Sequence, residues 1–185
     1  VSPHFCYRMD SPPAGELVKP LPDIALASRL SYFLWSSTPD SDLLRLAEVG
    51  ELTKTATLRS QTKRMLKDPK VEKFALEFFG QWLGYRDFLD RESVNRNVFR
   101  EFDDELKQAM FEEPTRVITH LIQNDLPVTE LLSSDSTFMN KRLARHYDLG
   151  FTPLAEDDPK TKWLHVSGMR DKGRGGILGM AVFLT

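Results

Sequence analysis

The sequence predicts an all-α fold: an irregular bundle of about six or seven helices behind an extended, proline-rich lead-in. Apolar residues recur at three- and four-residue steps along several segments, which is the spacing of one helix face. Residue types that start and stop helices separate these segments. The chain has no internal repeat, heptad run or low-complexity tract, so we expect irregular packing. We divide it into a lead-in over 1–23, a helical domain over 24–150, and a loop with the truncated start of a following module over 151–185.

The clearest helical pattern is a pair of amphipathic segments over residues 26–50. The apolar face of the first segment consists of Leu26, Leu30, Phe33 and Leu34. Thr38 is expected to cap the second helix, Pro39 suits its first turn, and Asp40 favours its positive end. The buried side of this second helix consists of Leu43, Leu44, Leu46 and Ala47.

A third helix is predicted over residues 55–67, and Pro69 is well placed to start a fourth one that ends near Gly84. The fourth helix carries a wide aromatic face, which includes Phe74, Phe78, Phe79 and Trp82. Aromatic stripes at helical spacing usually fill the core of a small helical domain. We therefore expect the bundle to pack around this face, in preference to a ligand or haem-edge pocket lined by these rings.

A long helix is predicted over residues 99–124, with Pro114 inside it. Proline removes a backbone donor and clashes with the preceding turn, so we expect a kink there or two helices that meet. A helical turn over 129–132 follows. Asp135, Ser136 or Thr137 is expected to cap a helix over 138–147, with Gly150 as its left-handed cap. We expect a short strand or extended piece over residues 163–166, and a last helix after the glycines of 173–176.

Composition excludes several classes of function. The formal net charge is −2, which gives no reason to expect nucleic acid or an anionic membrane as a partner. No apolar run approaches the ~20 residues that span a bilayer. Cys6 is the only cysteine, so an internal disulfide and covalent attachment of a c-type haem are both excluded, and we expect a buried thiol. The first residue is not Met and the last residues form an apolar run, so we expect a fragment of a longer chain.

Charged residues show no catalytic or metal-binding pattern. The four histidines, His4, His120, His146 and His165, lack the spacing that brings helical ligands onto one ion. Glu112, Arg116 and His120 are expected to form a surface charge ladder. The acidic pairs near residues 103–105 and 112–113 are assigned to solvated helix faces, against an acid–base role. The basic cluster over 59–73 is expected to be a solvated face or a docking surface for an acidic partner, in preference to a nucleic-acid site.

One loop is a candidate binding site. Glycines before a helix leave backbone amides free and two arginines add positive charge, which favours an anion at Arg170, Arg174, Gly175 and Gly176. The phosphate-loop ending with Lys and Ser or Thr is absent. The preferred interpretation is a tight turn that lets the last helix pack, with anion binding as the alternative.

Several phrases together resemble one protein family. They are Ser2–Arg8, Leu26–Ser37, Met65–Pro69, Gln81–Leu83, Leu131–Leu132, Thr137–Asn140, Leu143–Tyr147 and Arg174–Leu178. In this order they resemble a domain-of-unknown-function family of large exported planctomycete-type proteins, in which c-type cytochrome modules often occur. The resemblance implies an exported protein of the periplasm or cell envelope. It supplies no catalytic residues, and Pro114 departs from what we expect within the long helix.

The predicted function is a non-catalytic structural or protein-interaction helical module of a multidomain exported envelope protein. We assign no catalytic, cofactor or metal residue to this chain, and haem c is expected only elsewhere in the parent protein. The expected partners are other domains of the same chain or envelope proteins. Two alternatives stay open: an accessory part of an oxidoreductase that contains c-type cytochrome, and a carbohydrate- or anion-binding domain.

Overall fold

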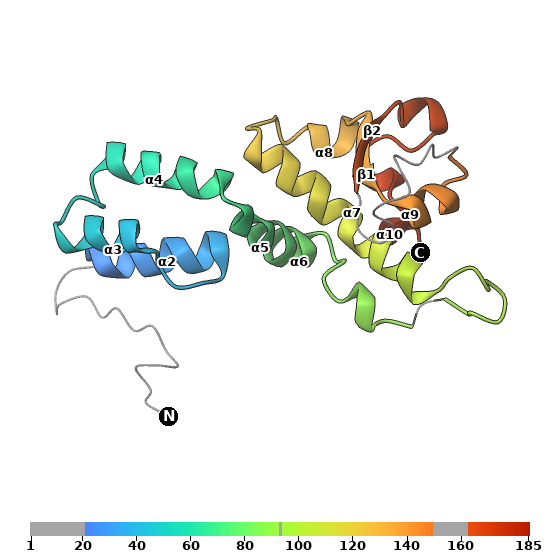
Figure 1. Cartoon of the computed structure of the whole chain (residues 1–185), viewed down its shortest axis with the longest axis horizontal. Helices are drawn as coiled ribbons and strands as arrows, with labels where there is room; N and C mark the ends of the chain where they lie inside the picture. Colours follow the sequence, from blue (N-terminus) through green and yellow to red (C-terminus); the bar gives the residue numbers. More distant parts are fainter. Residues whose placement is uncertain (1–20, 93, 150–162) are drawn as a thin grey trace, which may run out of the picture. The chain divides into compact units, whose positions relative to one another are not determined.

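The computed structural model describes residues 21–92, 94–149 and 163–185 (Figure 1). These ranges are mostly helical, with nine α-helices, short 3₁₀ and π segments and one two-stranded sheet. The prediction of a helical fold is confirmed, but the count of six or seven helices is too low because several helices have only one turn. The chain divides into two compact units, Val1–Met65 and Leu66–Thr185, which we call the first and the second unit.

The first unit contains α2 (Asp23–Trp35), α3 (Ser41–Glu48) and most of α4 (Thr55–Lys67). The helices predicted near 26–36 and over 55–67 are confirmed. The predicted cap of α3 is wrong, because the Asp40 side chain accepts a hydrogen bond from the Leu43 amide at 3.0 Å. Asp40 is itself the residue before the helix, so Thr38 and Pro39 lie outside it.

The core of the first unit is small and centres on an indole ring. Trp35 is 2% exposed, and its Nε1 donates a buried hydrogen bond to the Met65 carbonyl at 3.1 Å. The other fully buried large side chains are Leu43, Leu52 and Met65. Phe33 is 57% exposed, so its predicted place on the buried face of the first helix is wrong.

The predicted fourth helix has an irregular backbone. It consists of a 3₁₀ turn (Pro69–Val71), α5 (Glu72–Phe74), a π-helical segment (Ala75–Phe79) and α6 (Gly80–Trp82). The wider π turn shifts the phase of the helix, and Ala75 and Gly80 occupy its buried side. The bundle does not pack around the aromatic face as predicted, because Phe78 and Trp82 are 47% and 64% exposed.

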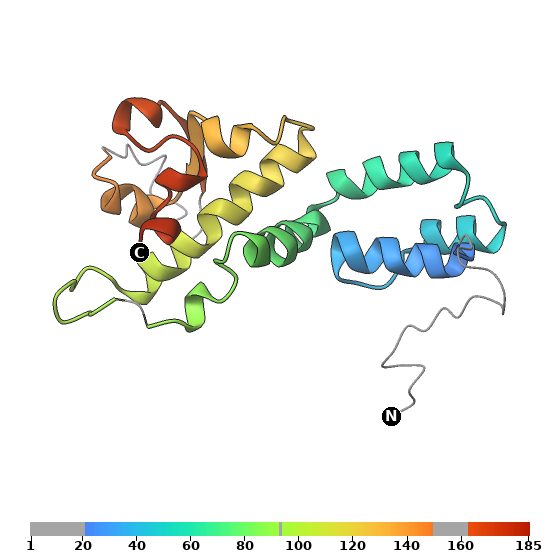
Figure 2. The ribbon, with the colours of Figure 1, turned by 180° about the vertical axis from the view of Figure 1, so that it is seen from behind.

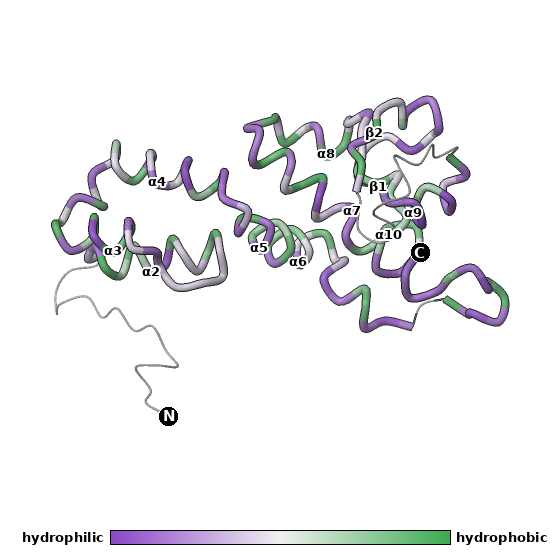
Figure 3. Tube along the Cα trace, in the orientation of Figure 1, coloured by the Kyte–Doolittle hydropathy of each residue, from purple (hydrophilic) through white to green (hydrophobic). Residues whose placement is uncertain are grey.

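The central element of the second unit is α7 (Asp104–Gln123), which follows a 3₁₀ turn at Phe88–Asp90. The helix starts five residues later than predicted because the Asp103 carboxylate caps it, accepting from the Leu106 amide at 2.7 Å. Pro114 lies inside a single continuous helix, so the alternative of two separate helices is wrong. Figure 3 shows hydrophobic and hydrophilic stretches alternating along the helices, as expected of amphipathic elements.

The remaining elements pack against α7 and each other (Figures 1 and 2). They are α8 (Glu130–Ser133), β1 (Ser136–Met139), α9 (Lys141–His146), β2 (Leu164–Ser167), 3₁₀ turns at Arg170–Lys172 and Ile177–Gly179, and α10 (Ala181–Leu184). The short strand predicted at 163–166 and the helical turn near 129–132 are confirmed. Residues 163–185 belong to the second unit, together with part of the range 24–150.

The start of the helix predicted over 138–147 is wrong. Residues 136–139 instead form β1, which pairs antiparallel with β2 in the register Ser136↔Ser167 to Met139↔Leu164. The cap of α9 is Asn140, whose side chain accepts from the Leu143 amide at 2.9 Å. Asp135, one of the predicted caps, accepts from the Arg170 amide at 2.8 Å.

Several predictions fall on residues outside the described ranges. They concern the lead-in as far as residue 20, His4, Cys6, Gly150 and the loop at 151–162. Across the described ranges, no helix combines the length and the apolar character that crossing a membrane requires.

Candidate functional site

The most unusual ionisable group in the described chain is a carboxylic acid in the core of the second unit. Glu113 of α7 is 1% exposed. The Thr137 hydroxyl of β1 donates to its Oε1 at 2.7 Å, and the Tyr147 hydroxyl at the end of α9 donates to its Oε2 at 2.5 Å. The Tyr147 oxygen in turn accepts from the Ala181 amide of α10 at 2.9 Å. One carboxyl group therefore connects four elements.

The position of Glu113 follows from helical spacing. Ala109, Met110 and Val117 are buried on α7, and they lie three or four residues from Glu113 on the same face. The acidic pair Glu112–Glu113 was assigned to a solvated face, and this holds only for Glu112, which pairs with Arg116 at 2.8 Å. The assignment of Glu113 is wrong. The missed signal was an acidic residue at an apolar position of the stripe.

An arginine completes the group that we call the Glu113 cluster: Glu113, Thr137, Tyr147 and Arg174. The Arg174 guanidinium lies over the Tyr147 ring, with Cζ 4.2 Å from the ring centroid. Its Nη1 donates to the Gly179 carbonyl at 3.3 Å. Its positive charge favours the ionised form of Glu113. Arg174 thus links the residues before α10 to the end of α9.

Burial dominates the titration of this cluster. It raises the pKa of Glu113 from 4.5 to about 7, although the hydrogen bonds from Tyr147 and Thr137 and the charge of Arg174 oppose the shift. Burial and the neighbouring Glu113 carboxylate raise the pKa of Tyr147. Near neutral pH the carboxyl group therefore exchanges a proton, whereas the phenol keeps its own.

A carboxyl group with a pKa near 7 has the proton affinity of a general acid or base. Such a role also requires that a substrate reach it. Both oxygens of Glu113 are hydrogen-bonded to hydroxyl groups of the chain itself, and Thr137 and Tyr147 are 3% and 6% exposed. Across the described residues, no buried side-chain nitrogen or oxygen lacks a hydrogen-bond partner. The arrangement is that of a closed structural junction.

The predicted anion-binding residues do lie together, but their donors bind the chain. The Arg170 guanidinium donates to the Ser133 carbonyl, and the Gly176 amide donates to the Ser134 carbonyl at 2.8 Å. A Cβ atom on Gly175 would lie 2.8 Å from the Arg170 Cγ, and one on Gly176 would overlap the Leu132 carbonyl oxygen. The contacts favour the tight turn, and anion binding stays a prediction.

Two histidines that are distant in sequence come together at the sheet. The rings of His120 and His165 are 4.7 Å apart, and His165 Nε2 lies 2.9 Å from the Ser136 hydroxyl. The Asn124 amide nitrogen approaches His120 Nδ1 at 3.2 Å and donates to the His120 carbonyl at 2.8 Å. In the described part of the chain, no group of three or more His, Cys, Asp or Glu side chains converges as a metal site would require.

Three of the sequence phrases on which the family resemblance depends contribute a residue to the Glu113 cluster. Thr137 belongs to the phrase Thr137–Asn140, Tyr147 to Leu143–Tyr147, and Arg174 to Arg174–Leu178. These three phrases meet around Glu113, which lies in none of them.

Comparison with known proteins identifies one family. A family model described as "Protein of unknown function (DUF1592)" matches residues 21–149. No curated protein and no solved structure matches the chain. The family model covers more than half of the 185 residues, and it includes α7, β1 and α9. The chain therefore belongs to this family of proteins of unknown function.

Proposed function

We propose that this chain is a non-catalytic structural or protein-interaction helical module of a multidomain exported envelope protein. The observation that carries the proposal is the closed Glu113 cluster. The pKa of its carboxyl group is near 7, as a general acid or base requires, but the hydroxyl groups of Thr137 and Tyr147 donate hydrogen bonds to both of its oxygens. A buried acid that is fully hydrogen-bonded within the chain organises the fold instead of meeting a substrate.

The structural task of the cluster is to hold the end of the chain on the helical core. Tyr147 accepts a hydrogen bond from the Ala181 amide of α10 and stacks against Arg174, which precedes α10. Ala181 and Val182 are buried against the same core as α7. In a longer protein, this junction would fix the direction in which the chain leaves the module.

The export of the protein and its partners are part of the proposal and rest on the resemblance of the quoted phrases. The partners we propose are other domains of the same chain or envelope proteins. Any haem c belongs to the parent protein outside this chain.

An enzymatic screen of the purified 185-residue chain tests the proposal. The substrates are a chromogenic ester, a phosphate monoester and a glycoside, assayed at neutral pH. We expect wild type, Glu113→Gln and the surface control Glu112→Gln to show the same background rate. Turnover by wild type above this background would contradict the proposal. Its loss in a Glu113→Gln variant that circular dichroism shows to be folded, with retention in Glu112→Gln, would identify the buried carboxyl as the catalytic group.

A further inference from the structure

The helix α4 has an unusual charge distribution. Between Thr55 and Lys67 it contains four basic residues and no acidic one. Arg64 is neutralised by Asp40, with bonds of 2.7 and 3.2 Å to the two carboxylate oxygens. Arg59 and Lys63 are exposed, and neither forms an ion pair with any described residue. Lys67 is likewise exposed and forms no ion pair with a described residue, so the outer face of α4 presents three uncompensated cations at successive four-residue steps.

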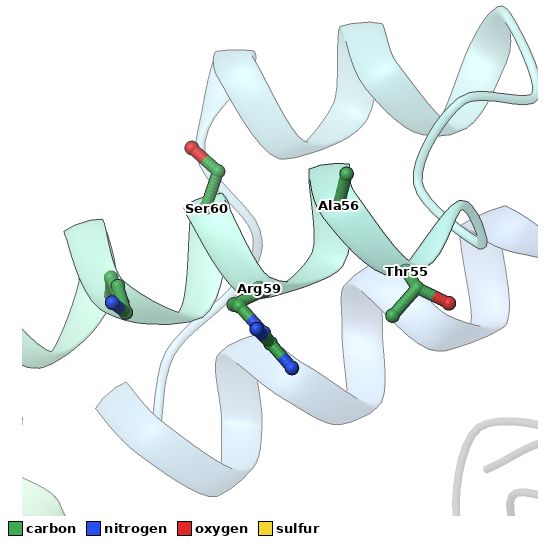
Figure 4. Close-up of a pocket in the computed structure, with 5 residues that line it drawn as sticks. Thr55, Ala56, Arg59 and Ser60 are labelled. Atoms are coloured by element: carbon green, nitrogen blue, oxygen red, sulfur yellow. The ribbon is translucent and has the colours of Figure 1, made fainter.

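The same face borders a wide-open space. Five residues of α4 line an open pocket of about 560 Å³: Thr55, Ala56, Arg59, Ser60 and Lys63 (Figure 4). The small side chain of Ala56 lets another backbone come close, and the aliphatic stems of Arg59 and Lys63 add apolar surface below their charges. The pocket begins at the first turn of α4, where the helix dipole is positive. The positive charge of this face favours an anionic occupant over a neutral one.

Spacing indicates the kind of occupant. Residues four apart on a helix lie on the same face, separated by about 6 Å. Carboxylates at this interval on a second helix would meet Arg59 and Lys63 together. The described residues that line this face include no aromatic side chain that could stack on bases, and the chain has a net charge of −2. Both observations disfavour a nucleic acid.

We propose that the outer face of α4, around Arg59 and Lys63, docks an acidic helical segment of a partner protein. This inference rests on the proposed role as an interaction module and gives that role a surface. The acidic residues of the partner would lie one turn apart, and a small or apolar residue between them would lie over Ala56.

A binding experiment with the whole chain tests this inference. The probe is a fluorescently labelled helical peptide of about four turns with Glu at every fourth position. A peptide of the same composition in scrambled order is the reference. We expect saturable binding of the ordered peptide by fluorescence anisotropy, weaker binding of the scrambled one, and a loss at high salt. The double variant Arg59→Glu/Lys63→Glu should bind the ordered peptide at least about tenfold more weakly.

The matched control is Lys141→Glu/Lys172→Glu, which changes the net charge equally at exposed positions of the second unit. It should bind the peptide like wild type, and circular dichroism should show that both double variants are folded. Three outcomes overturn the inference: no binding by wild type, equal weakening in both variants, or tighter binding of a DNA duplex than of the peptide. A self-association that Arg59→Glu/Lys63→Glu abolishes would replace the partner with a second copy. A failure here leaves the Glu113 assays, and the structural role, untouched.

Discussion

The two units use polar side chains in opposite ways. In the first unit, the charged contacts lie at helix ends and near the surface: Asp40 caps α3 and pairs with Arg64, whose side chain is 35% exposed. In the second unit the central polar contact is a carboxylic acid at 1% exposure, with partners 24 and 34 residues away in the sequence. Both arrangements join residues that are distant in sequence, since Arg64 lies 24 residues from Asp40, but only the second is buried.

This difference has an energetic consequence. A surface ion pair contributes at most about 1 kcal/mol, because water replaces the lost partner. A buried network loses more, because each partner left behind keeps its desolvation cost. The two units should therefore respond differently to the loss of one polar side chain.

Removal of the buried acid should have the largest effect. Glu113→Ala leaves the hydroxyl groups of Thr137 and Tyr147 without their acceptor and opens a cavity in the core of the second unit. We expect the free energy of unfolding to fall by about 3–5 kcal/mol in urea denaturation. The neighbouring control Glu112→Ala should cost less than about 1 kcal/mol. Equal losses in the free energy of unfolding for the two variants would show that the buried position of Glu113 does not increase its contribution to stability.

The pH dependence of stability gives the next largest effect. The pKa of Glu113 is 4.5 in the unfolded reference and about 7 in the folded chain, so the folded state binds the proton more tightly. Its contribution is complete below pH 4.5 and is lost as the pH rises to about 7, amounting to about 3 kcal/mol.

Two histidines oppose this trend. Burial and the charge of His165 lower the pKa of His120, and burial and Arg174 lower that of His146. Their contributions to stability are lost as the pH falls through the ordinary histidine range.

The contribution of Glu113 is isolated by the difference in free energy of unfolding between wild type and Glu113→Gln, measured by urea denaturation from pH 4.5 to 8. A difference that stays constant with pH would contradict the raised pKa.

The sequence predicted the first unit better than the second for a physical reason. The bounds of α2 and α4 follow from apolar periodicity and from breaker residues, which are local properties of the chain. The cap of α3 was misplaced by two residues because Thr38 and Asp40 are both good capping residues. Only the tertiary structure, in which Asp40 also binds Arg64, distinguishes them.

The second unit escaped prediction where contacts are distant in sequence. Residues 136–139 have helix-capping residues, but pairing with β2, which begins at Leu164, makes them a strand. The role of Glu113 depends on Tyr147 and Arg174, which no spacing rule connects to it. The π segment at Ala75–Phe79 shifts the phase of an aromatic stripe that was expected in the core. The phrases that carry the family resemblance include Thr137, Tyr147 and Arg174, but the resemblance implies no role for these residues.

A buried hydrogen bond in the first unit gives an intermediate test of the comparison. Trp35→Phe removes the donor to the Met65 carbonyl and leaves a small gap in a core of few residues. We expect a loss of about 2 kcal/mol in the free energy of unfolding. The exposed ring of Trp82 is the control, and Trp82→Phe should cost less than about 0.5 kcal/mol. A larger loss for Trp82→Phe would mean that the contacts of its ring with Phe78 and Phe79 stabilise the fold despite their exposure.

The smallest expected effect separates the two roles of Asp40. Asp40→Asn keeps a side-chain acceptor for the Leu43 amide but removes the charge that pairs with Arg64, whereas Asp40→Ala removes both. We expect a loss below about 1 kcal/mol for Asn and of about 1–2 kcal/mol for Ala in thermal unfolding. Arg64→Met should resemble Asp40→Asn at low salt, with a further loss of stacking on Trp35, 5.6 Å from the guanidinium carbon. If Asn costs as much as Ala, the ion pair with Arg64 and not the cap supports α3, and a partly exposed charge pair then matters more than the comparison of the two units predicts.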